Sequence, residues 1–266
     1  MNRFATLQQL LKPKTGEIAL SWTGQAGFSF KDASGLVIHV DPYLSNVCSR
    51  YVGYHRVIEP PASAEAWRGD RYLFTHDHRD HLDEESVPVI AANNPDALFY
   101  GPPSCISRLL ELGLHPKRLI TVRRGESKKI GDARIRAVLA VHTEDSVGYI
   151  LTIGGTKVYI TGDTVYSDEL IGIAGDRPDL MMCCINGRLG CMNIEDAVRL
   201  ASHIQPAIAV PMHVHMFAEN TASPEEFVRQ AKLHSGITQG IVMEHGVWYF
   251  YGQAQGWRKA EQLEQG

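Results

Sequence analysis

Short apolar runs separated by glycines fill the first third of the 266-residue chain. Runs of this length, rich in branched and aromatic side chains and ended by turn-forming residues, are typical of β-strands. We therefore expect strands at residues 18–22, 28–30, 37–40 and 72–74.

Apolar residues at helical spacing appear later in the chain. They predict helices at residues 84–92, 104–112, 193–204 and 224–233. Two of these have clear start signals, because Asn193 precedes Asp196 by three positions and Ser223 stands before Pro224 and two acidic residues.

Strand signals alternate with these helices. Residues 134–141 alternate strictly, which predicts a half-buried strand with Ile135, Ala137, Leu139 and Val141 on one face. Further strands are expected at residues 148–153, 158–160, 180–185, 207–210 and 247–251.

The order of these elements predicts the architecture. A β-rich start, a mixed middle and a final alternation of strands and helices suit two packed sheets with helices outside. No internal repeat or long linker divides the chain, and 44% hydrophobic residues can form a large core. We expect a single domain over residues 1–266, with residues 1–16 as an N-terminal extension.

Charge and cysteine content narrow the function classes. The net charge is −4 and no Lys/Arg cluster exceeds a pair, which disfavours a nucleic-acid partner. Residues 1–14 lack a signal-peptide core, and no segment has the length of a membrane span. Five cysteines without a CxxC spacing favour a reducing compartment, so we expect a cytoplasmic protein in which Cys183 and Cys184 are small buried fillers.

The richest chemistry lies directly after the strand ending at Phe74. His76, His78, Asp80 and His81 are four potential ligands within six positions. Such side chains are common metal ligands, and a cluster of this kind can serve two adjacent ions. With only 12 histidines in the chain, ordinary surface or core histidines are the alternative interpretation.

Three more potential ligands end later apolar runs: His142, Asp163 and His213. Because strand ends gather at one edge of a sheet, these residues can join the first cluster. Seven ligands suffice for two ions, and nitrogen and oxygen donors suit Zn²⁺, Mn²⁺ or Fe²⁺. Divalent ions can lower the pKa of water to about 7, which would supply hydroxide to attack a carbonyl or phosphoryl centre.

In order and type, HDHRDH, a strand-end histidine, TGDT and a PxH turn resemble the metallo-β-lactamase fold superfamily over roughly residues 18–250. The resemblance implies an α/β fold, the four-layer αββα sandwich. It also implies one ion held by His76, His78 and His142, a second held by Asp80, His81 and His213, and Asp163 between them. Asp80 would either transfer a proton during catalysis or act only as a structural ligand.

Several stretches are most similar to the branch that contains L-ascorbate-6-phosphate lactonase, including 74–83, 101–105, 113–118 and 210–213. This resemblance implies hydrolysis of a lactone of a phosphorylated sugar acid, and it allows a homo-oligomer. Residues 142–149 resemble broader hydrolases of the branch instead. Phosphodiester hydrolysis by the same two ions is the nearest alternative. A di-iron oxidoreductase and a metal-binding subunit without activity are alternatives from other classes.

Five further residues are candidates for supporting roles. Asp41 can orient a ligand histidine, although an Asp-Pro turn also explains it. Gln25 lies in a glycine turn that resembles a turn near the metals in this superfamily. Arg188 can clamp a phosphate or remain a solvated loop residue. His215 can contact substrate or point away from it, and His245 is more typical of a hydrogen-bonded loop residue.

Overall fold

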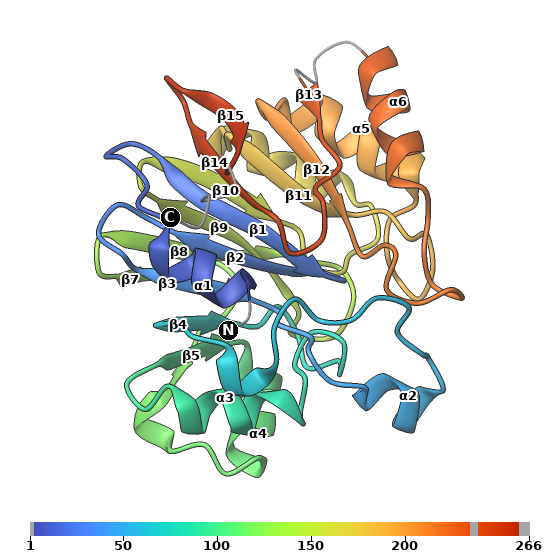
Figure 1. The fold of residues 1–266 in the computed structure, drawn as a ribbon. Coiled ribbons are helices and arrows are strands. Elements are labelled where there is room, and N and C mark those ends of the chain that lie inside the picture. Colours follow the sequence, from blue (N-terminus) through green and yellow to red (C-terminus); the bar gives the residue numbers. More distant parts are fainter. Residues whose placement is uncertain (1–2, 235–238, 261–266) are drawn as a thin grey trace.

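The computed structural model of the protein describes residues 3–234 and 239–260. Two mixed β-sheets lie face to face, and helices cover the outer face of each sheet (Figure 1). The predicted αββα sandwich is therefore confirmed. No helix of the described chain combines the length and apolar character needed to cross a membrane.

The first sheet contains eight strands and begins with the N-terminal half of the chain. In spatial order they are β15 (Gly256–Lys259), β14 (Trp248–Gly252), β1 (Ile18–Gly24), β2 (Gly27–Lys31), β3 (Val37–Val40), β4 (Arg71–Leu73), β5 (Leu98–Gly101) and β6 (Leu119–Thr121). Strands β3 to β6 pair in parallel, whereas the others pair antiparallel.

The second sheet contains seven strands. In spatial order they are β13 (Gln239–Gly240), β12 (Ile208–Met212), β11 (Leu180–Cys184), β10 (Thr156–Ile160), β9 (Val147–Ile153), β8 (Ala133–Leu139) and β7 (Ser127–Ile130). Strands β10 to β13 are parallel, and the hairpins β7–β8–β9–β10 are antiparallel.

The helices, apart from α2 (Val47–Val52), are divided between the two outer faces (Figure 1). In chain order they are α1 (Arg3–Leu10), α2 (Val47–Val52), α3 (Ser86–Asn93), α4 (Pro103–Glu111), α5 (Ile194–Ile204) and α6 (Pro224–Leu233). Helices α3 and α4 lie against the part of the first sheet that contains β4 and β5, and α5 and α6 lie against β11 and β12. Shorter 3₁₀ segments occupy Ala64–Ala66, Pro116–Arg118 and Asp168–Asp176.

Side chains that alternate along β1 explain why the first sheet packs against the second sheet on one face and against helices on the other. Ile18, Leu20 and Trp22 belong to the core between the sheets, whereas Ala19 faces the helices outside. The N-terminal extension contributes to the outer layer, because α1 inserts Phe4 between Trp67 and Trp248, with ring centroids 4.9 and 5.3 Å away. Both faces of the first sheet are thereby buried, as strands within a layered α/β protein require.

The structure also corrects parts of the predicted pattern. The predicted strand at residues 134–141 ends at Leu139, and Val141 is exposed although we expected it on the buried face. The chain leaves the sheet there because the Val141 amide donates to Thr164 Oγ1 at 2.9 Å. We did not predict α1, α2, or the short strands β5, β6, β7, β13 and β15. Such short elements carry little periodic signal.

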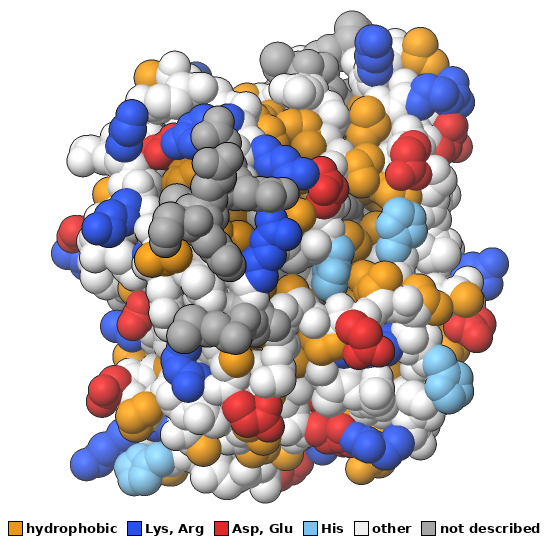
Figure 2. All heavy atoms as spheres, in the orientation of Figure 1, with side chains coloured by type: hydrophobic (Ala, Val, Ile, Leu, Met, Phe, Trp, Pro, Cys, Tyr) orange, Lys and Arg blue, Asp and Glu red, His pale blue; other side chains and the backbone are white. Residues whose placement is uncertain are grey.

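Positive and negative side chains are interspersed on the face of the molecule shown in Figure 2. No single sign of charge dominates that face.

Candidate metal centre

All seven predicted ligand residues meet at one edge of the sandwich. His76 follows β4, Asp163 follows β10 and His213 follows β12. Strands β10 and β12 run parallel within the second sheet, so their carboxyl ends reach the same edge. The end of β4 lies beside them, because the amide of Val147 at the start of β9 donates to Thr75 O at 3.0 Å.

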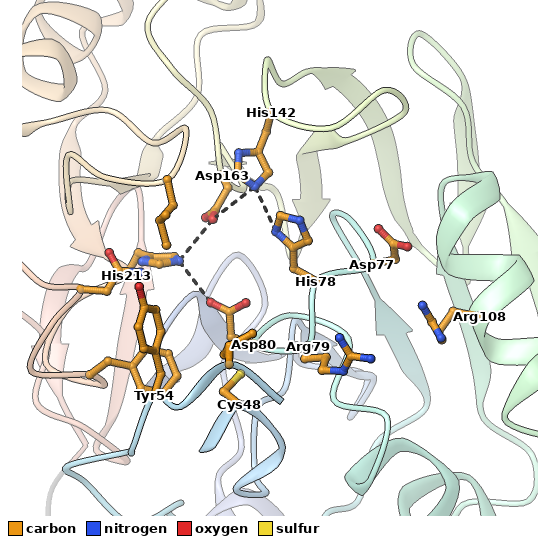
Figure 3. A pocket seen from close by; sticks show the side chains of 14 residues that line it. Cys48, Tyr54, Asp77, His78, Arg79, Asp80, Arg108, His142, Asp163 and His213 are labelled. Carbon is orange, nitrogen blue, oxygen red and sulfur yellow. Dashed lines mark hydrogen bonds and ion pairs between the residues drawn. The ribbon is translucent and has the colours of Figure 1, made fainter. Parts of the chain in front are cut away.

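Three imidazoles form the first group of donor atoms. His78 Nδ1 lies 3.0 Å from His76 Nε2. It also lies 3.1 Å from His142 Nε2 (Figure 3). The nitrogens of these three residues all lie within 4.8 Å of one another, which suits a shared metal ion.

A second group combines imidazoles with carboxylates. His213 Nε2 lies 3.4 Å from Asp80 Oδ2 and 3.2 Å from Asp163 Oδ2 (Figure 3). His81 Nε2 lies 3.3 Å from Asp163 Oδ1, and His142 Nε2 lies 3.8 Å from Asp163 Oδ2. The Asp163 carboxylate therefore lies between the two groups.

Two buried atoms of this cluster, His81 Nε2 and Asp163 Oδ1, face each other at 3.3 Å, but neither makes a hydrogen bond within the described residues. Burying polar atoms without hydrogen bonds is costly unless an ion compensates them. A divalent cation satisfies both atoms at once. The donor set therefore fits a metal centre on physical grounds.

Burial and close charges act in opposite directions on these groups. Burial would raise the pKa of the Asp163 carboxyl, but the imidazoles of His213 and His81 outweigh it and hold that pKa well below its ordinary value. Burial would likewise lower the pKa of His213, but Asp163 and Asp80 raise it to about 10. Without metal, the cluster is thus held by ion pairs, and a cation must displace the His213 proton.

Asp41 links the ligand loop to the first sheet. Its Oδ2 accepts from the Thr75 hydroxyl at 2.6 Å and lies 2.8 Å from His81 Nδ1. Its Oδ1 accepts from the Thr75 amide at 2.8 Å. Contact with Nδ1 orients the ring so that Nε2 faces the cluster, the arrangement expected of a residue that positions a ligand histidine.

Gln25 reaches the cluster from the turn between β1 and β2. Its side-chain amide donates to Asp80 Oδ2 at 2.7 Å and lies 3.0 Å from His213 Nε2. Its backbone carbonyl accepts from the His213 amide at 2.9 Å. The turn therefore positions both His213 and Asp80.

A pocket of about 590 Å³ opens over the cluster. Five of the predicted ligand residues line it: His78, Asp80, His142, Asp163 and His213. Figure 3 shows Tyr54 on one side of Asp80, and Arg79 and Arg108 on the other. Val52, Leu189 and Phe217 add apolar side chains to the lining, and the Phe217 ring lies 5.6 Å from that of Tyr54.

None of the five supporting candidates lines this pocket, but Asp41 and Gln25 contact predicted ligand residues. The side chains of the other three candidates, Arg188, His215 and His245, form no hydrogen bond or ion pair with a predicted ligand residue within the described part of the chain. Arg188 and His215 are exposed, and Arg188 borders a different hollow. His245 lies 3.1 Å from the Thr23 carbonyl oxygen, in the loop before β14. The structure therefore places none of the three against the cluster.

Sequence reasoning missed three residues at the site. Arg79 lies inside the HDHRDH motif, so its place in the sequence could have indicated that it is near the site. Arg108 lies on α4, and no motif in the sequence connects it with the site. Cys191 comes within 4.8 Å of donor atoms of His142 and Asp163, although no spacing in the sequence connects it to them. Only the tertiary structure brings Arg108 to the pocket and Cys191 to the cluster.

Comparison with known proteins agrees with this fold. The family model described as "Beta-lactamase superfamily domain" matches residues 19–213. The chain therefore belongs to the β-lactamase superfamily and has its metallo-β-lactamase fold.

Within the superfamily, the chain is a member of the UPF0173 family of metal-dependent hydrolases. The UPF0173 protein of Pyrococcus furiosus is 31% identical over 211 residues, covering 79% of this chain and 88% of that protein. The UPF0173 metal-dependent hydrolase of Archaeoglobus fulgidus is 27% identical over 250 residues, covering 88% and 99%. Among solved structures, a metallo hydrolase from Ignicoccus hospitalis shares the fold, with a TM-score of 0.72 and 24% identity over 88% of this chain and 98% of that one.

Proposed function

We propose that this protein is a two-metal hydrolase that opens a lactone of a phosphorylated sugar acid. The observation that carries the proposal is the convergence of seven donor residues, in overlapping groups of three, beneath a pocket of about 590 Å³. Zn²⁺, Mn²⁺ and Fe²⁺ all suit such donors. When bound, a divalent ion makes water a nucleophile at neutral pH and polarises the ester carbonyl.

Asp80 is the side chain best placed to move a proton. It lines the pocket, and its Oδ2 is held by Gln25 and faces His213, which leaves Oδ1 for a substrate. Ring opening forms one C–O bond and breaks another, and the departing alkoxide needs the proton that water gives up. A carboxylate can pass that proton on if it is held at the reacting atoms.

Arg79 and Arg108 support a phosphorylated substrate. They lie at one end of the pocket, and guanidinium groups match the geometry of phosphate oxygens. In this proposal, Arg79 and Arg108 bind the phosphate, which is the role that we predicted for Arg188. The apolar side chains of Tyr54 and Phe217 can pack against the carbon ring.

Metal analysis combined with a substrate panel tests the proposal. The protein is purified without added metal, its ions are counted, and it is assayed on lactones with and without a phosphate and on phosphodiesters. We expect two ions per chain, loss of lactone hydrolysis on chelation, and recovery with Zn²⁺ or Mn²⁺. Phosphodiester cleavage without lactone turnover would overturn the substrate assignment, and a single ion per chain would overturn the two-metal assignment.

A further inference from the structure

A thiol lies beside the seven donor residues without belonging to the predicted set. His142, Asp163 and Cys191 each offer one ligand atom, and these atoms lie within 4.8 Å of one another. Cys191 is 7% exposed, so its sulfur is enclosed by protein. It comes from the segment between β11 and α5, which contributes none of the seven predicted ligands.

Backbone hydrogen bonds hold this segment against the cluster. The Gly187 amide donates to the Met192 carbonyl at 2.9 Å, which closes the loop on itself. The Met192 amide donates to the carbonyl of Thr164, the residue after Asp163, at 2.7 Å. Cys191 and Asp163 are therefore fixed on connected stretches of backbone, so their proximity does not depend on a flexible side chain.

The same loop also contacts His142. The Gly190 carbonyl oxygen lies 3.1 Å from His142 Nδ1, so it can accept from that nitrogen and direct Nε2 towards the cluster. A Cβ atom at Gly190 would lie 2.8 Å from His142 Nδ1, which explains why this close approach needs glycine. One loop therefore places the Cys191 thiol beside the cluster and orients His142.

The Asp163 carboxylate is the charged group at this place. It is 4% exposed, and its two oxygens face different imidazoles: Oδ1 lies 3.3 Å from His81 Nε2, and Oδ2 lies 3.8 Å from His142 Nε2. A buried carboxylate has to be neutralised, and a cation bound between Asp163, His142 and Cys191 would do so. Figure 3 shows the Asp163 carboxylate directed into the cluster.

We propose that Cys191 is a sulfur ligand of the ion held by His142 and Asp163, and that the centre consequently prefers Zn²⁺ to Mn²⁺. Thiolate is a soft ligand that favours zinc, whereas manganese prefers oxygen. On binding, the S–H bond breaks, a sulfur–metal bond forms, and the proton passes to solvent. The inference rests on the proposed metal centre, but it does not depend on which substrate the enzyme hydrolyses.

X-ray absorption of the zinc-loaded, reduced protein tests this directly. We expect a sulfur neighbour at about 2.3 Å from zinc. The cobalt-loaded protein should show a sulfur-to-cobalt charge-transfer band that disappears in Cys191→Ser. Cys183→Ser is the matched control, because Cys183 is also buried but its Sγ donates to the Val210 carbonyl on the neighbouring strand. That variant should keep the band.

Metal titrations provide a second readout. We expect Cys191→Ser to lose at least about 10-fold in Zn²⁺ affinity, because even a change at a residue that only supports a ligand typically costs about 10-fold to 100-fold, and we expect a smaller change for Mn²⁺. Equal losses for both ions would contradict the proposed preference.

The wild-type spectrum is decisive even if Cys191→Ser does not fold. A zinc site without sulfur overturns the inference. If such a protein still binds metal and hydrolyses lactones, only the role of Cys191 is wrong. Failure to bind any ion would overturn both this inference and the proposed function, and elemental analysis distinguishes the two cases.

Discussion

Individual charged side chains distinguish the two ends of the pocket. Arg79 Nε lies 2.8 Å from Glu84 Oε1, and Arg108 Nη1 lies 3.9 Å from Glu84 Oε2. One carboxylate therefore holds both guanidinium groups at the same end of the pocket. The Arg79 guanidinium also lies over the Tyr51 ring, 4.2 Å from its centroid, which restricts it further.

Removing one guanidinium tests its role in binding phosphate. We expect Arg108→Gln to raise KM for a phosphorylated lactone about 30-fold, the equivalent of about 2 kcal/mol for a hydrogen bond to a charged group. Its kcat, and the KM of the unphosphorylated lactone, should change little. Arg229→Gln is the control, because Arg229 is an exposed residue of α6 paired with Glu226. An equal loss on both lactones would show that Arg108 acts on the fold and not on the phosphate.

Among the elements, α5 and α6 have similar starts but different neighbours. Asn193 Oδ1 accepts from the Asp196 amide at 2.8 Å, and Ser223 Oγ accepts from the Glu226 amide at 3.1 Å. Both caps were predicted from the sequence, and both are confirmed. The cap of α5 immediately follows the loop of residues 187–192, so it also fixes the end of the segment that carries Cys191.

Substitution of the two caps separates stability from metal binding. Asn193→Ala and Ser223→Ala should each lower the free energy of unfolding by about 1 kcal/mol, measured by urea denaturation, because each leaves a helix amide without its partner. Only Asn193→Ala should also weaken metal binding in a titration with Zn²⁺. Unchanged metal affinity in that variant would show that the loop does not depend on the helix start.

At the scale of the whole molecule, a buried histidine outside the metal centre limits the stability of the fold at low pH. His39 on β3 is fully buried beside Trp67, with its ring nitrogens 2.7 Å from Ser29 Oγ and 2.7 Å from the Arg68 carbonyl oxygen. Burial lowers its pKa to about 4, although the contact with the carbonyl opposes this shift. The fold therefore requires a neutral imidazole at this position.

The pKa of His39 is lower in the folded than in the unfolded state. Its contribution to the free energy of unfolding is therefore complete above about pH 6.5 and is lost as the pH falls towards 4. Between pH 7 and pH 5 this loss should be about 2 kcal/mol. Urea denaturation at both pH values checks it, with His39→Gln as the comparison. The variant should lose less stability on acidification, and an identical loss would show that other groups set the acid limit.

Most of the longer strands and helices, the caps of α5 and α6 and the seven candidate donor residues could be predicted from the sequence. Apolar periodicity and cap residues depend only on neighbouring residues, so they can be recognised in the sequence. The short strands β5 and β6 escaped prediction because three or four residues give no usable period. Val141 was assigned to the wrong face because its amide binds Thr164, a residue of a different strand end.

The sequence by itself determined which side chains can bind metal and that their strands end near one another. Only the tertiary structure decided what surrounds them: Arg108 at the pocket, Cys191 beside Asp163, and Arg188 and His215 outside. The reason is physical, because ligand chemistry belongs to the residue, whereas the walls of a pocket arise where loops distant in sequence pack together. The path of such a loop depends on long-range contacts that leave no periodic trace along the chain.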